Sequence, residues 1–208
     1  MDKAPLRRGQ PTVAARYNEN TALLAGDVML VKAYENLARI RSVYLKNVLQ
    51  LFNKTALGVC EGQQLDMDFE KQLSVSLEEY LRMIELKTSV ALAASLQLGA
   101  LLGGGGERNQ QLLYEFGRKL GIAFQLQDDY LDAFGDPEKF GKQTGGDILA
   151  NKKTFLLIHA LETSAERETL LKLIQQNPPD KVEKVLQIYR NCQAGEWAWH
   201  LKNKYLEE

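Results

Sequence analysis

Cysteine is scarce in this chain: Cys60 and Cys192 are the two present, far apart in 208 residues. Their spacing fits neither a disulfide framework nor a cysteine metal site, and free thiols indicate a reducing compartment. No apolar run approaches the length of a membrane-spanning helix, and the first ten residues lack the apolar segment of a signal peptide. We therefore expect a cytoplasmic protein without stable membrane insertion.

An excess of charge of either sign is also lacking. Lys and Arg number 26 against 27 Asp and Glu, which gives a formal net charge of −1. This balance does not favour nucleic acid or an anionic membrane surface, so we expect no nucleic-acid partner. The length and a hydrophobic content of 45% are ordinary for one globular domain with a large buried core.

Three carboxylates are concentrated in one otherwise apolar stretch, Gly121–Asp132. Each residue of a helix turns about 100° from the last, so Gln125, Asp128 and Asp132 fall on one stripe, with Asp129 at its edge. Apolar residues cover most of the remaining surface, which is typical of a buried helix. Buried carboxylates need a proton or a cation, and Mg²⁺ held by carboxylate oxygens is one interpretation. The alternative is an acidic helix end whose aspartates are solvated.

Two segments supply positive charge that suits a phosphate. Arg7 and Arg8 lie among two prolines and a glycine, and guanidinium groups make bidentate phosphate contacts. Lys142, Lys152 and Lys153 follow the acidic stretch in a segment that is rich in glycine. A lysine loop next to carboxylates is what a metal–phosphate site needs, whereas either segment taken alone is typical of a solvated surface loop.

The remaining sequence shows helical periodicity and no persuasive strand alternation. Ser76–Glu79 is a capping-box pattern that begins a helix to about Gly99. On this helix Lys87 stands among apolar and small residues, and it either reaches water or projects into a cavity. A central helix is expected over Glu107–Phe134, ended by Gly135. The predicted fold class is all-α, a bundle of long, mostly antiparallel helices around one central cavity.

Several helix ends are predicted from single residues. The first 20 residues are expected to be loop-like, and Asp27 is expected to cap or enter the next helix. The polar segment Glu61–Asp68 is either a solvated helix end or a polar shelf beside the acidic stripe. Capping boxes are expected at Thr163–Glu166 and Asp180–Glu183, and a last helix over Glu196–Glu208.

These motifs resemble those of one family, the trans-prenyltransferases that make polyprenyl, farnesyl or geranylgeranyl diphosphates. Gln125–Asp132 is similar to the family's second aspartate-rich motif, and Ala4–Thr12 is similar to the stretch after its first. Other segments match in order and spacing: Gly26-Asp27, Gly62-Gln63-Gln64-Leu65-Asp66, Lys87-Thr88, Phe134-Gly135-Asp136-Pro137, Gly141-Lys142, and Gly146-Asp147-Ile148 followed by Asn151-Lys152. Together the matches cover most of the chain.

The resemblance implies an isoprenoid-synthase-type helical bundle as a single domain over residues 1–208. It also implies an enzyme of isoprenoid biosynthesis, a Mg²⁺-dependent polyprenyl diphosphate synthase that joins an allylic diphosphate to isopentenyl diphosphate head to tail. Homodimerisation is implied by the family alone. The alternative is a non-catalytic homologue or subunit that binds diphosphate.

The resemblance also implies roles for single residues. Asp128 would bind metal, while Asp132 and Asp129 would bind it through water or shape the site. The allylic diphosphate would contact Arg7, Lys87, Gln125, Lys142 and Lys152, and the isopentenyl diphosphate would contact Arg8. Thr88 and Gln64 are contacts of second rank. The three aspartates with Lys87 and Lys142 form the expected catalytic set.

The family's first aspartate-rich motif is mostly absent. Met1-Asp2 matches its last two positions, so Asp2 is a third expected metal-binding residue. We expect the domain to be incomplete at both ends, because upstream helices of the family are missing and Glu196–Glu208 stops without a cap. Ala14 stands where many relatives carry histidine. Product chain length is not predicted, because residues flanking the first motif largely set it in the family.

Overall fold

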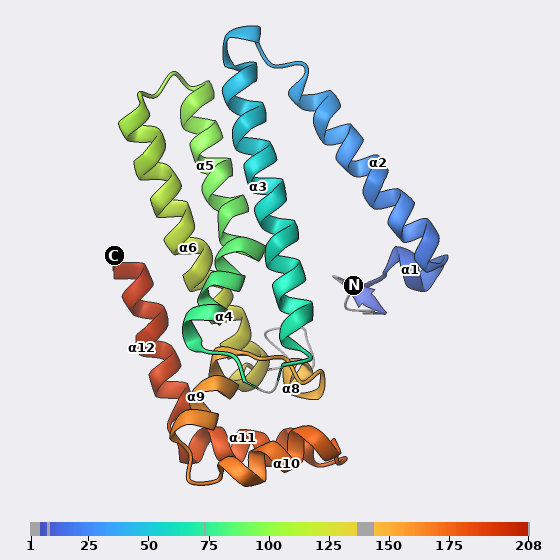
Figure 1. The fold of residues 1–208 in the computed structure, drawn as a ribbon, viewed down its shortest axis with the longest axis vertical. Coiled ribbons are helices and arrows are strands. Elements are labelled where there is room, and N and C mark those ends of the chain that lie inside the picture. Colours follow the sequence, from blue (N-terminus) through green and yellow to red (C-terminus); the bar gives the residue numbers. More distant parts are fainter. Residues whose placement is uncertain (1–4, 8, 73, 137–143, 208) are drawn as a thin grey trace. The chain divides into compact units, whose positions relative to one another are not determined.

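The computed structural model describes residues 5–7, 9–72, 74–136 and 144–207, which belong to two compact units, Met1–Gln50 and Leu51–Glu208. The all-α prediction is confirmed, since the described regular elements are helices apart from one short hairpin (Figure 1). Among the described residues, no helix has the length and apolar character needed to cross a membrane. A single domain over the whole chain stays a prediction.

The hairpin lies near the start of the first unit and corrects the expectation of an irregular segment. Strands β1 (Leu6–Arg7) and β2 (Gln10–Pro11) pair antiparallel. Gly9, in the turn, has φ +73°, a backbone region that glycine enters without steric cost. Two-residue strands are too short for an alternating pattern, which is why the sequence did not reveal them.

Two helices follow in the first unit, α1 (Val13–Arg16) and α2 (Glu19–Leu37). The side chain of Asn18 caps α2 by accepting a hydrogen bond from the backbone N–H of Thr21, at 2.8 Å. Asp27 lies eight residues into this helix and is not its cap. Helical periodicity placed the helix correctly, whereas the single residue chosen for its start was wrong.

Helix α3 (Ser42–Phe69) belongs to both units, and its second part is in Leu51–Glu208. The polar segment Glu61–Asp68 forms the last turns of α3. A Cβ atom on Gly62 would overlap the backbone nitrogen of Lys87, so glycine at this position lets the two backbones approach closely. This contact joins α3 to the segment that carries Lys87 and Thr88.

The helix predicted from Ser76 is interrupted by a wider turn. It consists of α4 (Leu77–Ile84), a π-helical segment η1 (Glu85–Ser89) and α5 (Val90–Leu102). The capping box is confirmed, because Ser76 and Glu79 each accept the other's backbone N–H. In η1 the backbone N–H of Val90 donates to the carbonyl of Glu85, five residues earlier. Such turns occur frequently at functional sites.

Helix α6 (Glu107–Phe134) has the predicted bounds and is followed by Gly135, whose N–H donates to the carbonyl of Leu131. It lies beside α5 in Figure 1. A Cβ on Gly121 would stand 2.6 Å from the Cα of Ser89, so α6 rests directly on the backbone of η1. The acidic residues on the next turns of α6 are thereby placed near Lys87 and Thr88.

The described residues that follow α6 form five helices: α8 (Gly146–Leu149), α9 (Phe155–Thr163), α10 (Arg167–Gln176), α11 (Lys181–Asn191) and α12 (Ala194–Glu207).

Both capping boxes predicted for this part are wrong. Thr163 is the last residue of α9, and its hydroxyl donates to the carbonyl of His159. Asp180 occupies the N-cap position of α11, but its side chain pairs with Lys184 instead of the backbone. Side chains of this kind have several local partners, so the pattern alone does not select one.

The hydrophobic core of the second unit supports the C-terminal half of α6. Its least accessible members include Tyr80, Leu126, Phe155, Leu170 and Val185, from α4, α6, α9, α10 and α11. Helix α12 runs along α6 and closes one side of this core (Figure 1). The acidic residues of α6 are therefore attached to the best-packed part of the described structure.

Candidate functional site

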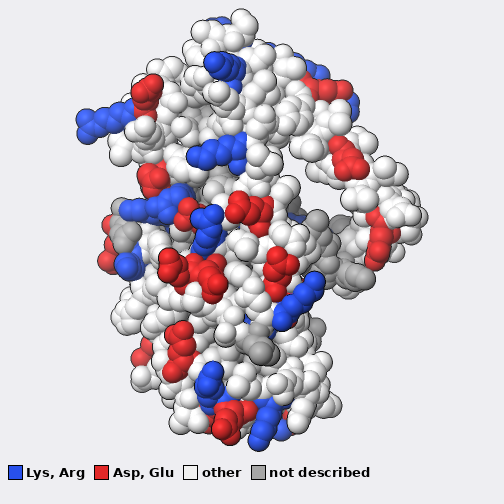
Figure 2. Space-filling view, viewed as in Figure 1, with Lys and Arg blue, Asp and Glu red and all other residues white. Residues whose placement is uncertain are grey.

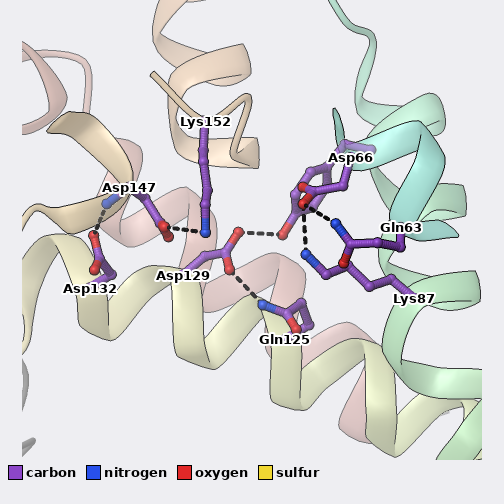
Figure 3. A network of polar contacts seen from close by, with 9 residues as sticks. Gln63, Asp66, Lys87, Gln125, Asp129, Asp132, Asp147 and Lys152 are labelled. Carbon is purple, nitrogen blue, oxygen red and sulfur yellow. Dashed lines mark hydrogen bonds and ion pairs between the residues drawn. The ribbon is translucent and has the colours of Figure 1, made fainter. Parts of the chain in front are cut away.

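Asp129 is the most deeply buried of the three α6 aspartates, with 7% of its surface exposed. The hydroxyl of Tyr80 donates to its Oδ2 at 2.7 Å, and Nε2 of Gln125 donates to its Oδ1 at 2.8 Å (Figure 3). Burial raises the pKa of Asp129 to about 7, the charge of Asp147 acts in the same direction, and the two hydrogen bonds oppose them. A solvated helix end does not describe this residue.

Gln125 joins Asp129 to the π-helical segment. Its Oε1 accepts a hydrogen bond of 3.1 Å from the hydroxyl of Thr88, while its Nε2 donates to Asp129. Both ends of the amide are therefore engaged, and its orientation is fixed. Two residues that the resemblance assigns to diphosphate binding, Gln125 and Thr88, are in direct contact.

Lys87 forms an ion pair with Asp66 of α3, with 2.7 Å between Nζ and Oδ2. Only 14% of the Asp66 side chain is exposed, and Nε2 of Gln63 contacts the same oxygen at 3.5 Å (Figure 3). Asp66 is therefore a partly buried polar residue that pairs with Lys87, and it is not part of a solvated helix end. Gln64 turns instead to Asp68 on the exposed side of α3, with 2.9 Å between Nε2 and Oδ1.

The C-terminal end of the acidic stripe is held by the chain that follows α6. The backbone N–H of Asp147 donates to Oδ2 of Asp132 at 3.0 Å, and the N–H of Gly145 donates to its carbonyl at 2.7 Å. Nζ of Lys152 lies 2.9 Å from Oδ1 of Asp147 (Figure 3). Lys152 of the predicted lysine loop thus lies next to the acidic helix, through its pair with Asp147.

Charges are paired locally in this region. Lys87 with Asp66, Lys152 with Asp147, and Arg118 with Glu85 at 3.0 Å are three such pairs. On the face in Figure 2, acidic and basic side chains are interspersed. Each lysine of these pairs is held in place by its carboxylate partner.

The predicted site residues still to be located are Asp2, Arg7, Arg8, Asp128 and Lys142. Asp2, Arg8 and Lys142 lie outside the described residues. Arg7 is exposed in β1 of the first unit. Asp128 is partly exposed on α6, next to the buried Asp129.

The carboxylates of α6 fit a divalent metal as part of a larger donor set. Among the described residues, no three His, Cys, Asp or Glu side chains form a ready metal cluster. Mg²⁺ takes one or two carboxylates and completes its shell with water and phosphate oxygens, so such a cluster is not required. Asp128 and Asp132 are partly exposed and four residues apart on one helix, which suits that donor chemistry. The metal assignment to Asp128, Asp132 and Asp2 stays a prediction.

Tyr80 contacts Asp129 of this cluster, although no sequence motif singled it out. Its hydroxyl is buried with the ring, and burial, followed by the charge of Asp129, raises its pKa well above the usual value. A tyrosine on a buried face needs a partner for its hydroxyl, and this requirement was the available signal. This signal could not identify Asp129 as the partner, because Tyr80 and Asp129 are 49 residues apart in the sequence.

A model of the family described as polyprenyl synthetase matches residues 1–192. The chain belongs to the polyprenyl synthetase family. It is 39% identical over 201 residues to a short chain isoprenyl diphosphate synthase of Methanothermobacter thermautotrophicus, which covers 95% of the chain and 62% of that protein. The chain thus spans less than two thirds of the length of this relative. The resemblance inferred from the motifs is confirmed.

Solved structures confirm the isoprenoid-synthase fold of this chain. A crystal structure of a geranylgeranyl pyrophosphate synthase matches with a TM-score of 0.92 and 42% identity, over 100% of the chain and 66% of that protein. A polyprenyl synthase of Caulobacter crescentus, solved with calcium and isoprenyl diphosphate, matches with a TM-score of 0.88 and 26% identity, over 99% and 63%.

Proposed function

We propose that this chain forms the allylic-diphosphate-binding part of a polyprenyl diphosphate synthase, which condenses that substrate head to tail with isopentenyl diphosphate. One observation carries the proposal: the acidic residues of α6, the Lys87–Asp66 pair and the Lys152–Asp147 pair lie close together, although they come from distant parts of the sequence (Figure 3). Carboxylates flanked by two lysines suit a metal-bound diphosphate.

Each residue of the network has a distinct role in this proposal. Lys87 and Lys152 release their carboxylate partners and bind diphosphate oxygens. Gln125, fixed by Thr88 and Asp129, presents its amide to the same group. Asp129 has a structural role, because both of its oxygens already accept hydrogen bonds from Tyr80 and Gln125. It holds Gln125 in position.

Asp128 and Asp132, with Asp2, would hold Mg²⁺, which when bound would neutralise charge on the departing diphosphate. The lysines stabilise the same developing charge as the bond between the allylic carbon and diphosphate breaks. The double bond of isopentenyl diphosphate then forms the new carbon–carbon bond, and the departing diphosphate takes the proton that is lost. Apolar helix faces shield the allylic cation from water.

A non-catalytic homologue or subunit that binds diphosphate is the second candidate. A turnover assay with labelled isopentenyl diphosphate and an allylic diphosphate separates the two: prenyl transfer supports the enzyme, and tight binding without transfer supports the binding subunit.

The direct test is calorimetric titration of the 208-residue chain with an unreactive allylic diphosphate analogue, with and without Mg²⁺. We expect Mg²⁺-dependent binding that Asp128→Ala abolishes while its circular dichroism stays unchanged, because a carboxylate ligand is lost without loss of packing. Asp180→Ala, which removes an exposed carboxylate paired with Lys184, is the matched control and should bind normally. Equal binding by Asp128→Ala contradicts the site assignment, and no binding by the folded wild-type chain contradicts the proposal.

A further inference from the structure

Lys181 is a buried charged residue outside the proposed diphosphate site and outside the motifs of the family. It begins α11 and is 1% exposed, less than the buried Asp129. Taking an ammonium group out of water is unfavourable unless polar groups surround it. Burial lowers the pKa of Lys181, and the charge of Lys153 lowers it further.

Two asparagines accept hydrogen bonds from this ammonium group. Nζ of Lys181 donates to Oδ1 of Asn151 at 2.5 Å and to Oδ1 of Asn177 at 3.1 Å. Both asparagines have left-handed backbone conformations, with φ of +57° and +47°. This conformation is uncommon for residues with a side chain, although asparagine adopts it more readily than most. One ammonium group therefore ties together two turns that are 26 residues apart.

Asn151 directly precedes Lys152, and the turn that contains both residues is connected to α6 by hydrogen bonds through Asp147. The N–H of Lys152 donates to the carbonyl of Asp147 at 3.0 Å, and its Nζ pairs with the carboxylate of the same residue. The N–H of Asp147 in turn donates to Oδ2 of Asp132. A continuous series of contacts thus runs from Lys181 through Asn151 and Lys152 to Asp132.

We propose that Lys181 is a positioning residue, which fixes Asn151 and thereby holds the turn that carries Lys152 against Asp147 and Asp132. Lys181 acts through Asn151 and does not itself contact the proposed ligand site. Its consequence for diphosphate binding rests on the proposed function, whereas its effect on the turn does not. The role explains why a lysine is buried at the start of α11.

The surroundings of Lys181 allow a clean substitution. Apolar side chains line the small pocket beside it, among them Ile148, Leu157, Ile174 and Val185. Methionine has a similar length and no charge, so Lys181→Met removes the donor while filling the same space. Asn151→Gly removes the acceptor and keeps a residue that tolerates positive φ.

The first test is residue-resolved amide hydrogen exchange by NMR on the 208-residue chain. In Lys181→Met we expect exchange at the N–H groups of Asp147 and Lys152 to accelerate about tenfold, because a charge-assisted hydrogen bond no longer opposes local opening. Asn151→Gly should do the same, and should add little in the Lys181→Met background. Asn151→Gly also keeps the question decidable should Lys181→Met fail to fold.

Two control variants distinguish positioning from general packing. Asn177→Gly removes the other bond of the same ammonium, and Lys184→Met removes an exposed lysine of α11 that pairs with Asp180. Neither should accelerate exchange at Asp147 and Lys152. The proposal is overturned when Lys181→Met changes these two amides no more than the controls do, or raises exchange equally throughout α9 and α11.

The second test measures binding of the unreactive allylic diphosphate analogue with Mg²⁺. We expect about tenfold weaker binding for Lys181→Met and for Lys152→Met, and a double variant no weaker than the weaker single one, because both changes remove the same lysine contact. Additive losses would show that Lys181 acts independently of Lys152. Absence of binding by the wild-type chain would contradict the proposed function, and the exchange result would still decide the positioning role.

Discussion

The two compact units form helices of similar length by different means. Among the described residues of Met1–Gln50, Val48 alone is buried, and the 19 residues of α2 include none. In Leu51–Glu208, by contrast, α6 has buried residues along much of its length and joins a core shared by seven other helices. Periodic apolar residues predict a helix in both units, and within the second unit tertiary burial stabilises it.

The same contrast exists within α6. Leu126 is inaccessible to solvent, whereas Leu120, less than two turns earlier, is 37% exposed. Asp129 lies next to the inaccessible part and is fixed by two hydrogen bonds. Rigid placement of catalytic carboxylates requires such a packed support, so the location of the proposed site follows from the location of the core.

The largest effect should come from the core beneath the site. Leu126→Ala should lower the free energy of unfolding by about 3 kcal/mol, through lost apolar burial and the cavity left behind. Urea unfolding followed by circular dichroism measures it. Leu120→Ala, on the same helix, should lower it by less than about 1 kcal/mol, because that side chain remains partly in water. Equal losses would contradict the contrast between the two parts of α6.

The contact between α3 and η1 should give the next largest effect. In Gly62→Ala the added methyl group meets the backbone of Lys87, so we expect a loss of about 2 kcal/mol in unfolding free energy. Gly58→Ala, one turn earlier, is the matched control, since its methyl group would stand 3.6 Å from Leu86 in ordinary contact. There we expect a gain of roughly 0.5–1 kcal/mol from helix propensity. A stable Gly62→Ala protein would show that the two backbones separate easily.

Removal of one buried hydroxyl should have a smaller effect. Tyr80→Phe leaves Asp129 with one donor in place of two, so we expect unfolding free energy at neutral pH to fall by about 1–2 kcal/mol. Thermal unfolding together with the analogue titration measures both stability and site geometry. Tyr17→Phe, at a tyrosine that is 62% exposed, is the comparison variant. Should Tyr80→Phe behave as the wild type, the hydroxyl does not hold Asp129.

The smallest effect is expected in the first unit. Leu23→Ala on α2 should change the unfolding free energy by less than about 0.5 kcal/mol, because the leucine is exposed and alanine is the better helix former. The same urea measurement applies. A loss comparable to that of Leu126→Ala would mean that α2 is buried in solution, and the difference between the units would disappear.

The features predicted correctly from the sequence are those determined by residues close together in the chain. The bounds of α6 and the capping box at Ser76 follow from local patterns, and the acidic stripe follows from helical spacing. The pair of Lys87 with Asp66 and the contact of Tyr80 with Asp129 were not predicted, because they join helices through the tertiary fold. The start of α2 was misplaced because Asn18 and Asp27 are both acceptable caps by composition.

The burial of Lys181 also could not be predicted from neighbouring residues. A single lysine in a polar helix start predicts a surface residue, and only the fold reveals the two asparagine oxygens around it. Asp2, Arg8 and Lys142 lie outside the described residues, and their assigned roles stay predictions.

The π-helical turn η1 determines how the side chains of α5 are rotated about the helix axis relative to those of α4. A turn closed by a bond over five residues contains one residue more than a turn of α-helix, and each residue of an α-helix corresponds to about 100° of rotation. Removal of one residue from Glu85–Ser89 would rotate every side chain of α5 by that angle relative to α4. Tyr80 could still face Asp129, but the small residues of α5 would no longer face α6. A change in the length of this segment should therefore displace all of α5, whereas a substitution within it alters one side chain.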